Sequence, residues 1–226
     1  RSLFTSEAFN ETEIILGLSF QTDVRMHSVT WKLFSASFGS NWSLTKQFVN
    51  QYLMLDGSRF TDRTDYQTMT YQEEFQERDY RLQQTVISPE YRRKISGTEK
   101  KDAPNFSMTS TGYQPIKWAL DDDVHVGKAT SNNSASIFRY AEVLLNYAEA
   151  KAELGEFSED IWNKTIKLLR ERAGVSGDIP ASYDPYMAEY FRNQTTDKWI
   201  LEIRRERGVG LVFENVRYDD MMRWKM

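Results

Sequence analysis

The sequence is 226 residues long, enough to bury the core of one domain or of two closely packed ones. Apolar residues make up 40% of it and charged residues 27%, which excludes a disordered chain, and no stretch approaches the ~18 consecutive apolar residues of a membrane helix. A formal net charge of −4 argues against a nucleic-acid partner, and the absence of cysteine excludes disulfides, thiol catalysis and thiolate metal sites.

The first part of the chain, residues 1–45, is polar, aromatic and only weakly periodic. The apolar run from Glu13 to Leu16 indicates a strand. The stretch from Ser28 to Leu44 contains four rings, Trp31, Phe34, Phe38 and Trp42. Ser, Gly and Asn residues separate these rings, so we predict a loop that displays aromatic side chains.

The next part, up to residue 135, is predicted to alternate between short elements and loops. Residues 46–56 favour a short helix that runs into an extended segment, and Asp56–Gly57 favours a tight turn, since Gly accepts a positive φ. Two strands are predicted at 81–87 and 116–120, and two loops at 88–113 and 121–134. The first of these loops carries a basic cluster, for which a solvated surface is the expected setting.

From Ser136 onward the apolar spacing becomes helical. Helices are predicted from Ser136 to Gly155, from Ser158 to Gly174, and from Pro185 onward. The longest amphipathic segment is 196–213. Gly208 and Gly210 lie inside it, and each costs about 1 kcal/mol in a helix, so close packing compensates or the helix is interrupted.

Five local signatures follow one another in the last third of the chain. They are Tyr140–Ala150, Leu169–Gly174, Glu206–Arg207, Glu214–Tyr218 and Arg223–Trp224. Shorter matches precede them at Gln51–Gly57, Phe75–Leu82 and Thr111–Trp118. In this order the signatures resemble the carboxy-terminal part of the RagB/SusD family, the glycan-capturing lipoproteins on the surface of Bacteroidetes. Gly210 departs from the family pattern, which has a glutamate there, and Asn215 replaces a glycine.

The resemblance implies a fold and a setting. The fold is mainly α, an irregular helical domain with long loops and a few short strands, which packs against a tetratricopeptide-like helical half that is mostly absent. We interpret the chain as one domain, 1–226, with a loop-rich aromatic part at 1–135 and a helical part at 136–226. Because it starts at Arg1 without a Met or signal peptide, we interpret it as a piece of a longer protein.

The family also implies function and partners. Its members bind oligosaccharide at the extracellular face of the outer membrane and deliver it to a SusC-like TonB-dependent transporter for nutrient uptake and polysaccharide utilisation. Membrane contact would be made only through a lipid anchor missing from this chain. No enzymatic activity and no cofactor are expected. A helical protein–protein interaction module and, less favoured, a glycoside hydrolase remain alternatives.

The charged residues of the signatures are interpreted as structural. Glu142 and Glu149 share a helix face, which predicts surface or interhelical ion pairs. Arg78, Asp79 and Arg81 are predicted to pair at the buried edge of a strand. The run from Arg204 to Arg207 is predicted to lie on a helix surface.

A metal site has one weak candidate, Asp121 with Asp123. In a strand these residues and His125 would face the same side, and carboxylates suit a hard ion such as calcium. The run lacks the glycine and the distal glutamate of a calcium loop, so a solvated acidic loop is the favoured interpretation.

Aromatic recognition is the remaining chemistry. Sugar rings present apolar C–H faces that stack on flat aromatic rings, while amides bond the hydroxyl groups. The candidate glycan-binding residues are Trp31, Phe38, Asn41 and Trp42, and a second group is Tyr66 and Tyr71. Burial of each ring in a core or interdomain contact is the competing interpretation. No nucleophile elbow, phosphate-binding Gly loop or His-Glu-x-x-His motif is present.

Overall fold

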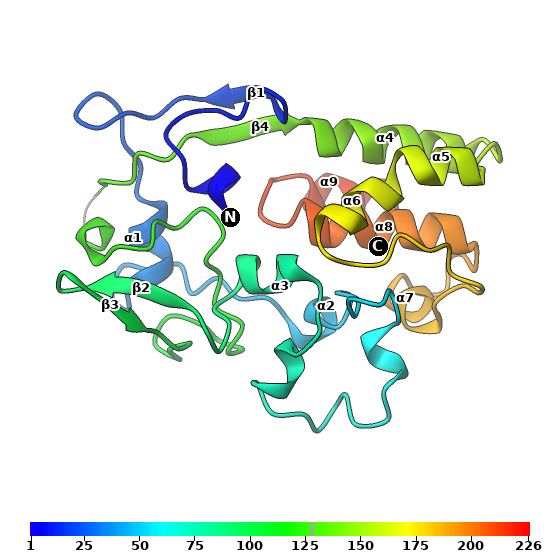
Figure 1. The fold of residues 1–226 in the computed structure, drawn as a ribbon, viewed down its shortest axis with the longest axis horizontal. Coiled ribbons are helices and arrows are strands. Elements are labelled where there is room, and N and C mark those ends of the chain that lie inside the picture. Colours follow the sequence, from blue (N-terminus) through cyan, green and yellow to red (C-terminus); the bar gives the residue numbers. More distant parts are fainter. Residues whose placement is uncertain (128) are drawn as a thin grey trace. The chain divides into compact units, whose positions relative to one another are not determined.

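The computed structural model describes residues 1–127 and 129–226, and they form two compact units. The first unit comprises residues 1–46 and 83–139, and the second comprises residues 47–82 and 140–226 (Figure 1). The predicted helix-rich fold with a few short strands is confirmed. The grouping of the chain into a single domain divided near residue 135 stays a prediction.

A two-stranded antiparallel sheet lies in the first unit. Strand β1 (Ile14–Leu18) pairs with β4 (Ala135–Arg139), with Ile14 opposite Arg139 and Leu18 opposite Ala135. The predicted strand at Glu13–Leu16 is thereby confirmed. The prediction of Ser136 as a helix N-cap is wrong, because pairing with β1 keeps this segment extended until the helix begins at Tyr140.

The core of the first unit forms around helix α1 (Val29–Phe34). Leu33 and Phe34 pack with Ile87, Ile116 and Ala119. The loop predicted at Ser28–Leu44 is therefore wrong for its first half, and Phe34 is a core residue with only 3% of its surface exposed. The second half of that stretch is a loop, as predicted.

A β-hairpin carries the basic cluster. Strands β2 (Arg92–Ile95) and β3 (Thr98–Lys101) are antiparallel and are joined through Ser96 and Gly97, which both have a positive φ. The loop predicted at 88–113 is wrong over this hairpin. The strand predicted at 116–120 is also wrong, since Trp118 has a φ of 73° and Pro115 alone makes an isolated bridge, to Val86.

The other elements of residues 1–127 are short. They are α2 (Lys46–Val49), α3 (Tyr80–Thr85) and the 3-10 helices Phe60–Asp62 and Glu73–Phe75, with two further 3-10 helices at Ser2–Phe4 and Asp123–His125. The turn at Asp56–Gly57 is confirmed. The strand predicted at 81–87 is wrong, because the Asp79 carboxylate accepts the Arg81 N–H at 2.8 Å and so caps a helix there.

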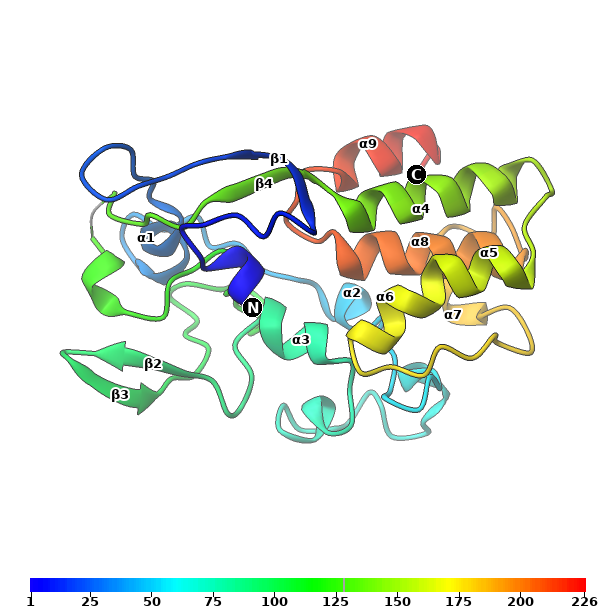
Figure 2. The ribbon, with the colours of Figure 1, turned by 45° about the horizontal axis from the view of Figure 1, so that its top comes forward.

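Helices dominate the second unit. They are α4 (Tyr140–Glu153), α5 (Glu159–Lys164), α6 (Ile166–Arg172), α7 (Pro185–Tyr190), α8 (Lys198–Gly210) and α9 (Arg217–Arg223). Helices α4, α6 and α8 lie side by side (Figures 1 and 2) and bury a shared core that includes Leu145, Trp162, Ile166 and Ile203. Within the described residues, no helix is long and apolar enough to span a membrane.

Two of the predicted helices differ in detail from the observed ones. The helix predicted from Ser158 to Gly174 is divided at Thr165, whose hydroxyl donates to the Ile161 carbonyl at 2.6 Å. Helix α8 runs through Gly208 and ends at Gly210. A Cβ at Gly208 would lie 3.4 Å from the side chain of Gln51, so close packing accounts for this glycine.

The charges of α8 are buried, which contradicts the predicted helix surface at Arg204–Arg207. Glu206 is fully buried and accepts hydrogen bonds from Arg81 at 2.7 Å and from Arg170 at 2.8 Å. One turn earlier, Glu202 binds Arg170 and Arg205. Because a buried charge is costly unless it is paired, these contacts fix how α8 meets its neighbours.

Further ion pairs extend from Glu206 through Arg81 and from Glu202 through Arg205. We call the whole set the buried ion-pair network. Its members are Asp79, Arg81, Arg170, Asp184, Glu202, Arg205 and Glu206. Asp79 lies against Arg81 at 2.6 Å, so the predicted pairing is confirmed, although the residues begin a helix rather than order a strand. Asp184 pairs with Arg205 and also caps α7.

A second group of paired charges, buried except for Arg223, joins α4, α8 and α9. Glu149 binds Arg223 at 2.5 Å, and Asp220 binds Arg207 at 2.9 Å. The interhelical ion pairing predicted for Glu149 is confirmed, but this carboxylate is buried and not on the surface.

The network sets the protonation of its carboxylates. Burial acts to raise the pKa of Glu206, but the charges of Arg81 and Arg170 outweigh it and lower this pKa to about 2. Burial likewise acts to raise the pKa of Glu202, but the charges of Arg205 and Arg170 outweigh it, so this pKa is also lowered. A folded-state pKa below the unfolded value means that the stabilisation is complete above about pH 4.5 and is lost as the pH falls towards 2.

We predict that Glu206→Gln lowers the free energy of unfolding at pH 7 by about 3–5 kcal/mol, because it removes a buried carboxylate that pairs with both Arg81 and Arg170 and leaves each of them with a single acidic partner. We also expect the stability of the variant to fall less steeply than that of the wild type between pH 4.5 and pH 2. Urea unfolding followed by circular dichroism across this pH range measures both effects.

Glu171→Gln is the matched control, since Glu171 on α6 is exposed and lies 3.9 Å from Lys167. An exposed pair of this kind contributes at most about 1 kcal/mol. Equal losses of stability in the two variants would show that the network does not hold the unit together.

Candidate functional site

The aromatic loop, residues 35–44, follows α1 and displays its rings outward. Phe38 is 65% exposed and Trp42 is 47% exposed. Trp31, on α1, is half-buried, and its ring centroid lies 5.6 Å from that of Phe38 at an interplanar angle of 53°. The structure thus brings two of the predicted rings together and places Asn41 and Trp42, both exposed, a few residues further along the loop.

Hydrogen bonds from both ends hold the backbone of the aromatic loop. The Ser40 N–H donates to the Lys32 carbonyl at 3.0 Å, and the Phe38 N–H donates to the Ser35 hydroxyl at 3.1 Å. At the far end, the Ser43 hydroxyl lies 2.7 Å from that of Thr109. The exposed rings are therefore carried on an ordered backbone.

Gly39 lets the loop fold back on α1. A Cβ at this position would lie 2.0 Å from the Ser35 carbonyl oxygen and 3.0 Å from that of Lys32. Backbone atoms cannot move aside as the end of a flexible side chain can, so only glycine fits this turn.

The chemistry of the aromatic loop suits a neutral polyhydroxylated ligand. Its rings offer flat apolar faces, and the Asn41 amide offers both a donor and an acceptor at the surface. The Lys32 ammonium lies 5.6 Å from the Trp31 centroid and donates to the Phe38 carbonyl at 3.2 Å. Phe34, by contrast, is covered by Arg93, whose guanidinium lies 4.3 Å from its ring.

The second predicted group, Tyr66 and Tyr71, packs within the second unit. The Tyr66 ring meets Phe60 edge to face at 6.1 Å, and the Tyr71 ring lies 4.9 Å from that of Phe75. Burial raises the pKa of the Tyr71 phenol, and the nearby Glu74 carboxylate raises it further. These two rings are less available for stacking than those of the aromatic loop.

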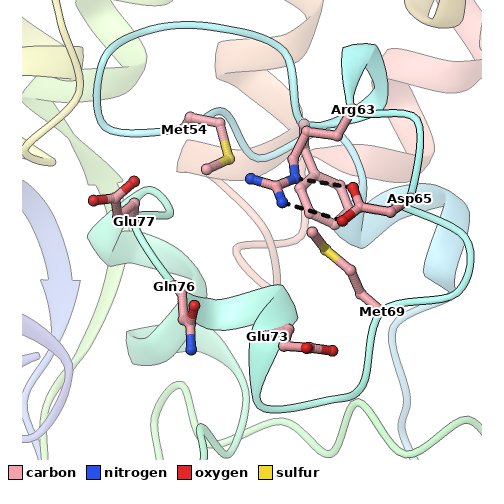
Figure 3. Close-up of a pocket in the computed structure, with 8 residues that line it drawn as sticks. Met54, Arg63, Asp65, Met69, Glu73, Gln76 and Glu77 are labelled. Atoms are coloured by element: carbon pink, nitrogen blue, oxygen red, sulfur yellow. Dashed lines mark hydrogen bonds and ion pairs between the residues drawn. The ribbon is translucent and has the colours of Figure 1, made fainter.

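A pocket of about 510 Å³ opens beside these tyrosines. It is lined by Met54, Phe60, Arg63, Asp65, Met69, Glu73, Gln76 and Glu77 (Figure 3). Sequence analysis did not identify it. Its residues come from a polar, aperiodic segment, and the turn at Asp56–Gly57 is the only local signal near them.

An ion pair occupies the middle of this pocket. Arg63 donates to Asp65 at 3.2 and 3.3 Å, and the side chains of Met54 and Met69 point towards the pair (Figure 3). Among the lining residues, Phe60 is buried, and the guanidinium of Arg78 lies 3.6 Å from its ring centroid. The exposed lining is polar and mostly acidic, with no flat ring facing outward among its members.

The weak metal candidates, Asp121 and Asp123, are engaged elsewhere. Asp121 accepts from Arg1 and from the Tyr91 hydroxyl, and Asp123 accepts the Ser96 N–H at 2.9 Å. Asp123 to His125 form a 3-10 turn and not the strand that would align three ligands. Across residues 1–127 and 129–226, no group of three or more His, Asp or Glu side chains is arranged to hold a metal ion.

Solved structures resemble this chain over nearly all of its length. A SusD-like protein from Bacteroides fragilis has a TM-score of 0.66 at 20% sequence identity, over 94% of this chain and 43% of that protein. A second protein from the same species, described as a SusD-like carbohydrate-binding protein, has a TM-score of 0.66 at 25% identity over 94% and 42%. A SusD superfamily protein from Parabacteroides distasonis has a TM-score of 0.53 at 21% identity over 93% and 39%.

The chain thus spans less than half of the length of the proteins it resembles. No protein with a curated function matches the sequence. The model of the SusD family matches residues 21–226, which include the aromatic loop and every helix of the second unit. The resemblance inferred from the ordered signatures is confirmed, and the chain belongs to the SusD family.

Proposed function

We propose that this chain is part of a protein that binds an oligosaccharide without hydrolysing it, through Trp31, Phe38, Asn41 and Trp42. The observation that carries the proposal is the exposure of Phe38 and Trp42 on an ordered loop beside Trp31. Exposed rings that are grouped on one surface segment, unlike single exposed rings, are typical of a binding site. Membership of the SusD family, one of whose solved structures is described as carbohydrate-binding, supports a sugar as that ligand.

The composition of the loop supports binding without hydrolysis. Glycoside hydrolases act through two carboxyl groups about 5–10 Å apart on either side of the bond that is cleaved. Residues 35–44 contain neither Asp nor Glu. Incubation of the protein with a bound oligosaccharide should therefore release no smaller product on chromatography.

The cellular setting belongs to the same proposal. The protein would lie at the extracellular face of the outer membrane, held by a lipid anchor outside this chain, and would pass its ligand to a SusC-like TonB-dependent transporter. A tetratricopeptide-like half would account for the length that the solved relatives have beyond this chain. Co-purification of the transporter with the protein tests this arrangement.

A protein-binding role is the second candidate, and the sheet of the first unit favours it. Ile15, Leu16 and Leu18 of β1 and Ile137 of β4 are each between 39% and 57% exposed. Exposed apolar side chains gathered on one small sheet are typical of protein contacts. This role predicts that transporter co-purification survives removal of the rings of the aromatic loop and is lost when Leu16 is replaced by Asp.

We predict that Trp42→Ala weakens oligosaccharide binding by about tenfold or more, because truncation of a ring at the centre of a binding site costs at least ~1.4 kcal/mol. Affinity electrophoresis against a panel of polysaccharides, followed by calorimetry on the best ligand, measures the loss. Trp31→Ala should weaken binding too, with some loss of stability because Trp31 is half-buried.

Phe106→Ala is the control, since Phe106 is 77% exposed in the same unit but outside the aromatic loop. It should bind as the wild type does. Normal binding by both Trp variants would place the glycan elsewhere.

We predict that Gly39→Ala reduces oligosaccharide binding by displacing Phe38 and Trp42, since the new methyl group would overlap the Ser35 carbonyl. The strain should also cost about 1–3 kcal/mol of stability. Calorimetry and thermal unfolding measure the two effects. Ser37→Ala, a small change at an exposed position of the same loop, is the control. Unchanged affinity in Gly39→Ala would show that the shape of the loop is irrelevant to binding.

A further inference from the structure

A second pocket of the second unit lies apart from the aromatic loop and from the pocket around Arg63. Its volume is about 560 Å³, and it is lined by Glu153, Gln194, Arg204, Arg223, Trp224 and Lys225. Volumes of this size are typical of small-molecule sites, which range over about 300–1,000 Å³. Three of its side chains are cationic and one is anionic.

Arg204 is the unusual member of this lining. It is only 8% exposed, and its Nε has no hydrogen-bond partner. Its one hydrogen bond runs from Nη1 to the Gln194 side-chain oxygen, at 3.5 Å. Within the described part of the chain, no carboxylate lies within ion-pair distance of this guanidinium.

Two aromatic rings lie close to the Arg204 guanidinium. Its centre lies 4.9 Å from the Trp224 ring and 5.2 Å from the Phe191 ring. These contacts fix the plane of the group but neutralise little of its charge. Arg204 therefore lines the pocket with a buried guanidinium whose Nε makes no hydrogen bond.

The other buried arginines of α8 are paired with carboxylates, unlike Arg204. Arg205 binds both Glu202 and Asp184, and Arg207 binds Asp220. An unpaired buried charge costs several kcal/mol, which is why such groups are paired in folded proteins. Burial lowers the pKa of Arg204 from its ordinary value, and the nearby carboxylates of Glu149 and Glu153 offset this effect only in part.

The neighbouring charges leave the pocket positive. Arg223 already binds Glu149 and Asp220. Lys225 is exposed at the pocket edge, and Glu153, the single acid of the lining, is more than 4 Å from Arg204. An anion that entered here would meet two cations and one carboxylate.

We propose that this pocket binds an oxyanion, with Arg204 as its main ligand and Lys225 as its second. A guanidinium offers parallel N–H groups that match the two oxygens of a carboxylate or sulfate. Two kinds of ligand could supply such an anionic group, a free inorganic oxyanion or an acidic sugar. The site uses no residue of the aromatic loop, so its test is independent of the test of glycan binding.

Isothermal calorimetry at constant ionic strength tests the site with sodium sulfate, sodium glucuronate and glucose as probes. Saturable binding of sulfate or glucuronate, and none of glucose, is expected. Binding of sulfate alone assigns the pocket to a free oxyanion, and tighter binding of glucuronate than of sulfate assigns it to an acidic sugar. The absence of saturable binding for both anions overturns the proposal.

Variants locate the binding. Arg204→Gln should weaken anion binding at least tenfold. Arg204→Lys should weaken it less, because lysine keeps the positive charge but lacks the two parallel N–H groups of the guanidinium. Lys167→Gln removes an exposed lysine of α6 in the same unit and should change nothing. Unchanged affinity in Arg204→Gln overturns the assignment.

Glu153→Gln decides whether Glu153 itself serves as the counter-charge of Arg204 in solution, and it keeps the test valid even where Arg204→Gln does not fold. With an external anion as the ligand, removal of the Glu153 charge tightens the binding of sulfate or glucuronate several-fold and leaves the melting temperature nearly unchanged. A clear drop in the melting temperature of Glu153→Gln, together with unchanged or weaker anion binding, contradicts the proposal.

Discussion

The second unit is organised by the need to pair the charges that α8 carries into its interior. Glu202, Arg205 and Glu206 are at most 2% exposed, and each has an opposite charge within hydrogen-bond distance. Their partners come from α3, α6 and the start of α7. Loss of a single partner would leave a buried charge uncompensated, so these segments are fixed together and not merely packed.

This constraint explains the ordered signatures that identify the family. Arg170 of the second signature binds Glu206 of the third, and Arg223 of the last binds Glu149 of the first. Their charges therefore build the unit, while the aromatic loop of the other unit carries none of them. Buried ionic groups are a specific but costly way to join helices, and they remain paired at neutral pH because the arginines lower the pKa of Glu206 to about 2.

Sequence reasoning correctly predicted the features that depend on neighbouring residues in the chain. The helix starts predicted at Ser158 and Pro185 and the tight turn predicted at Asp56–Gly57 are all observed, because neighbouring side chains and backbone preferences decide them. It failed for residues whose conformation or burial depends on a partner far away in the sequence. Ser136 is extended because β1 pairs with its strand, and Glu206 is buried because Arg81, 125 residues earlier in the chain, neutralises it.

The candidate site was predictable only in part for the same reason. The polar setting of Phe38 and Trp42 correctly indicated exposed rings, but it gave the same indication for Phe34, which the core of its unit covers. The two pockets left no pattern in the sequence, since their linings assemble from residues whose neighbours are set by the fold. The absence of a carboxylate within ion-pair distance of Arg204 is visible only once every nearby carboxylate has been placed.

The central claim is that buried charges hold the second unit together while glycan binding belongs to the aromatic loop. Hydrogen–deuterium exchange of the protein, measured with and without its tightest-binding oligosaccharide, tests this claim most directly. The account predicts slower exchange for residues 29–44 on binding and unchanged rates for α8. Slower exchange in α8 or around residues 54–77, with residues 29–44 unaffected, would contradict it.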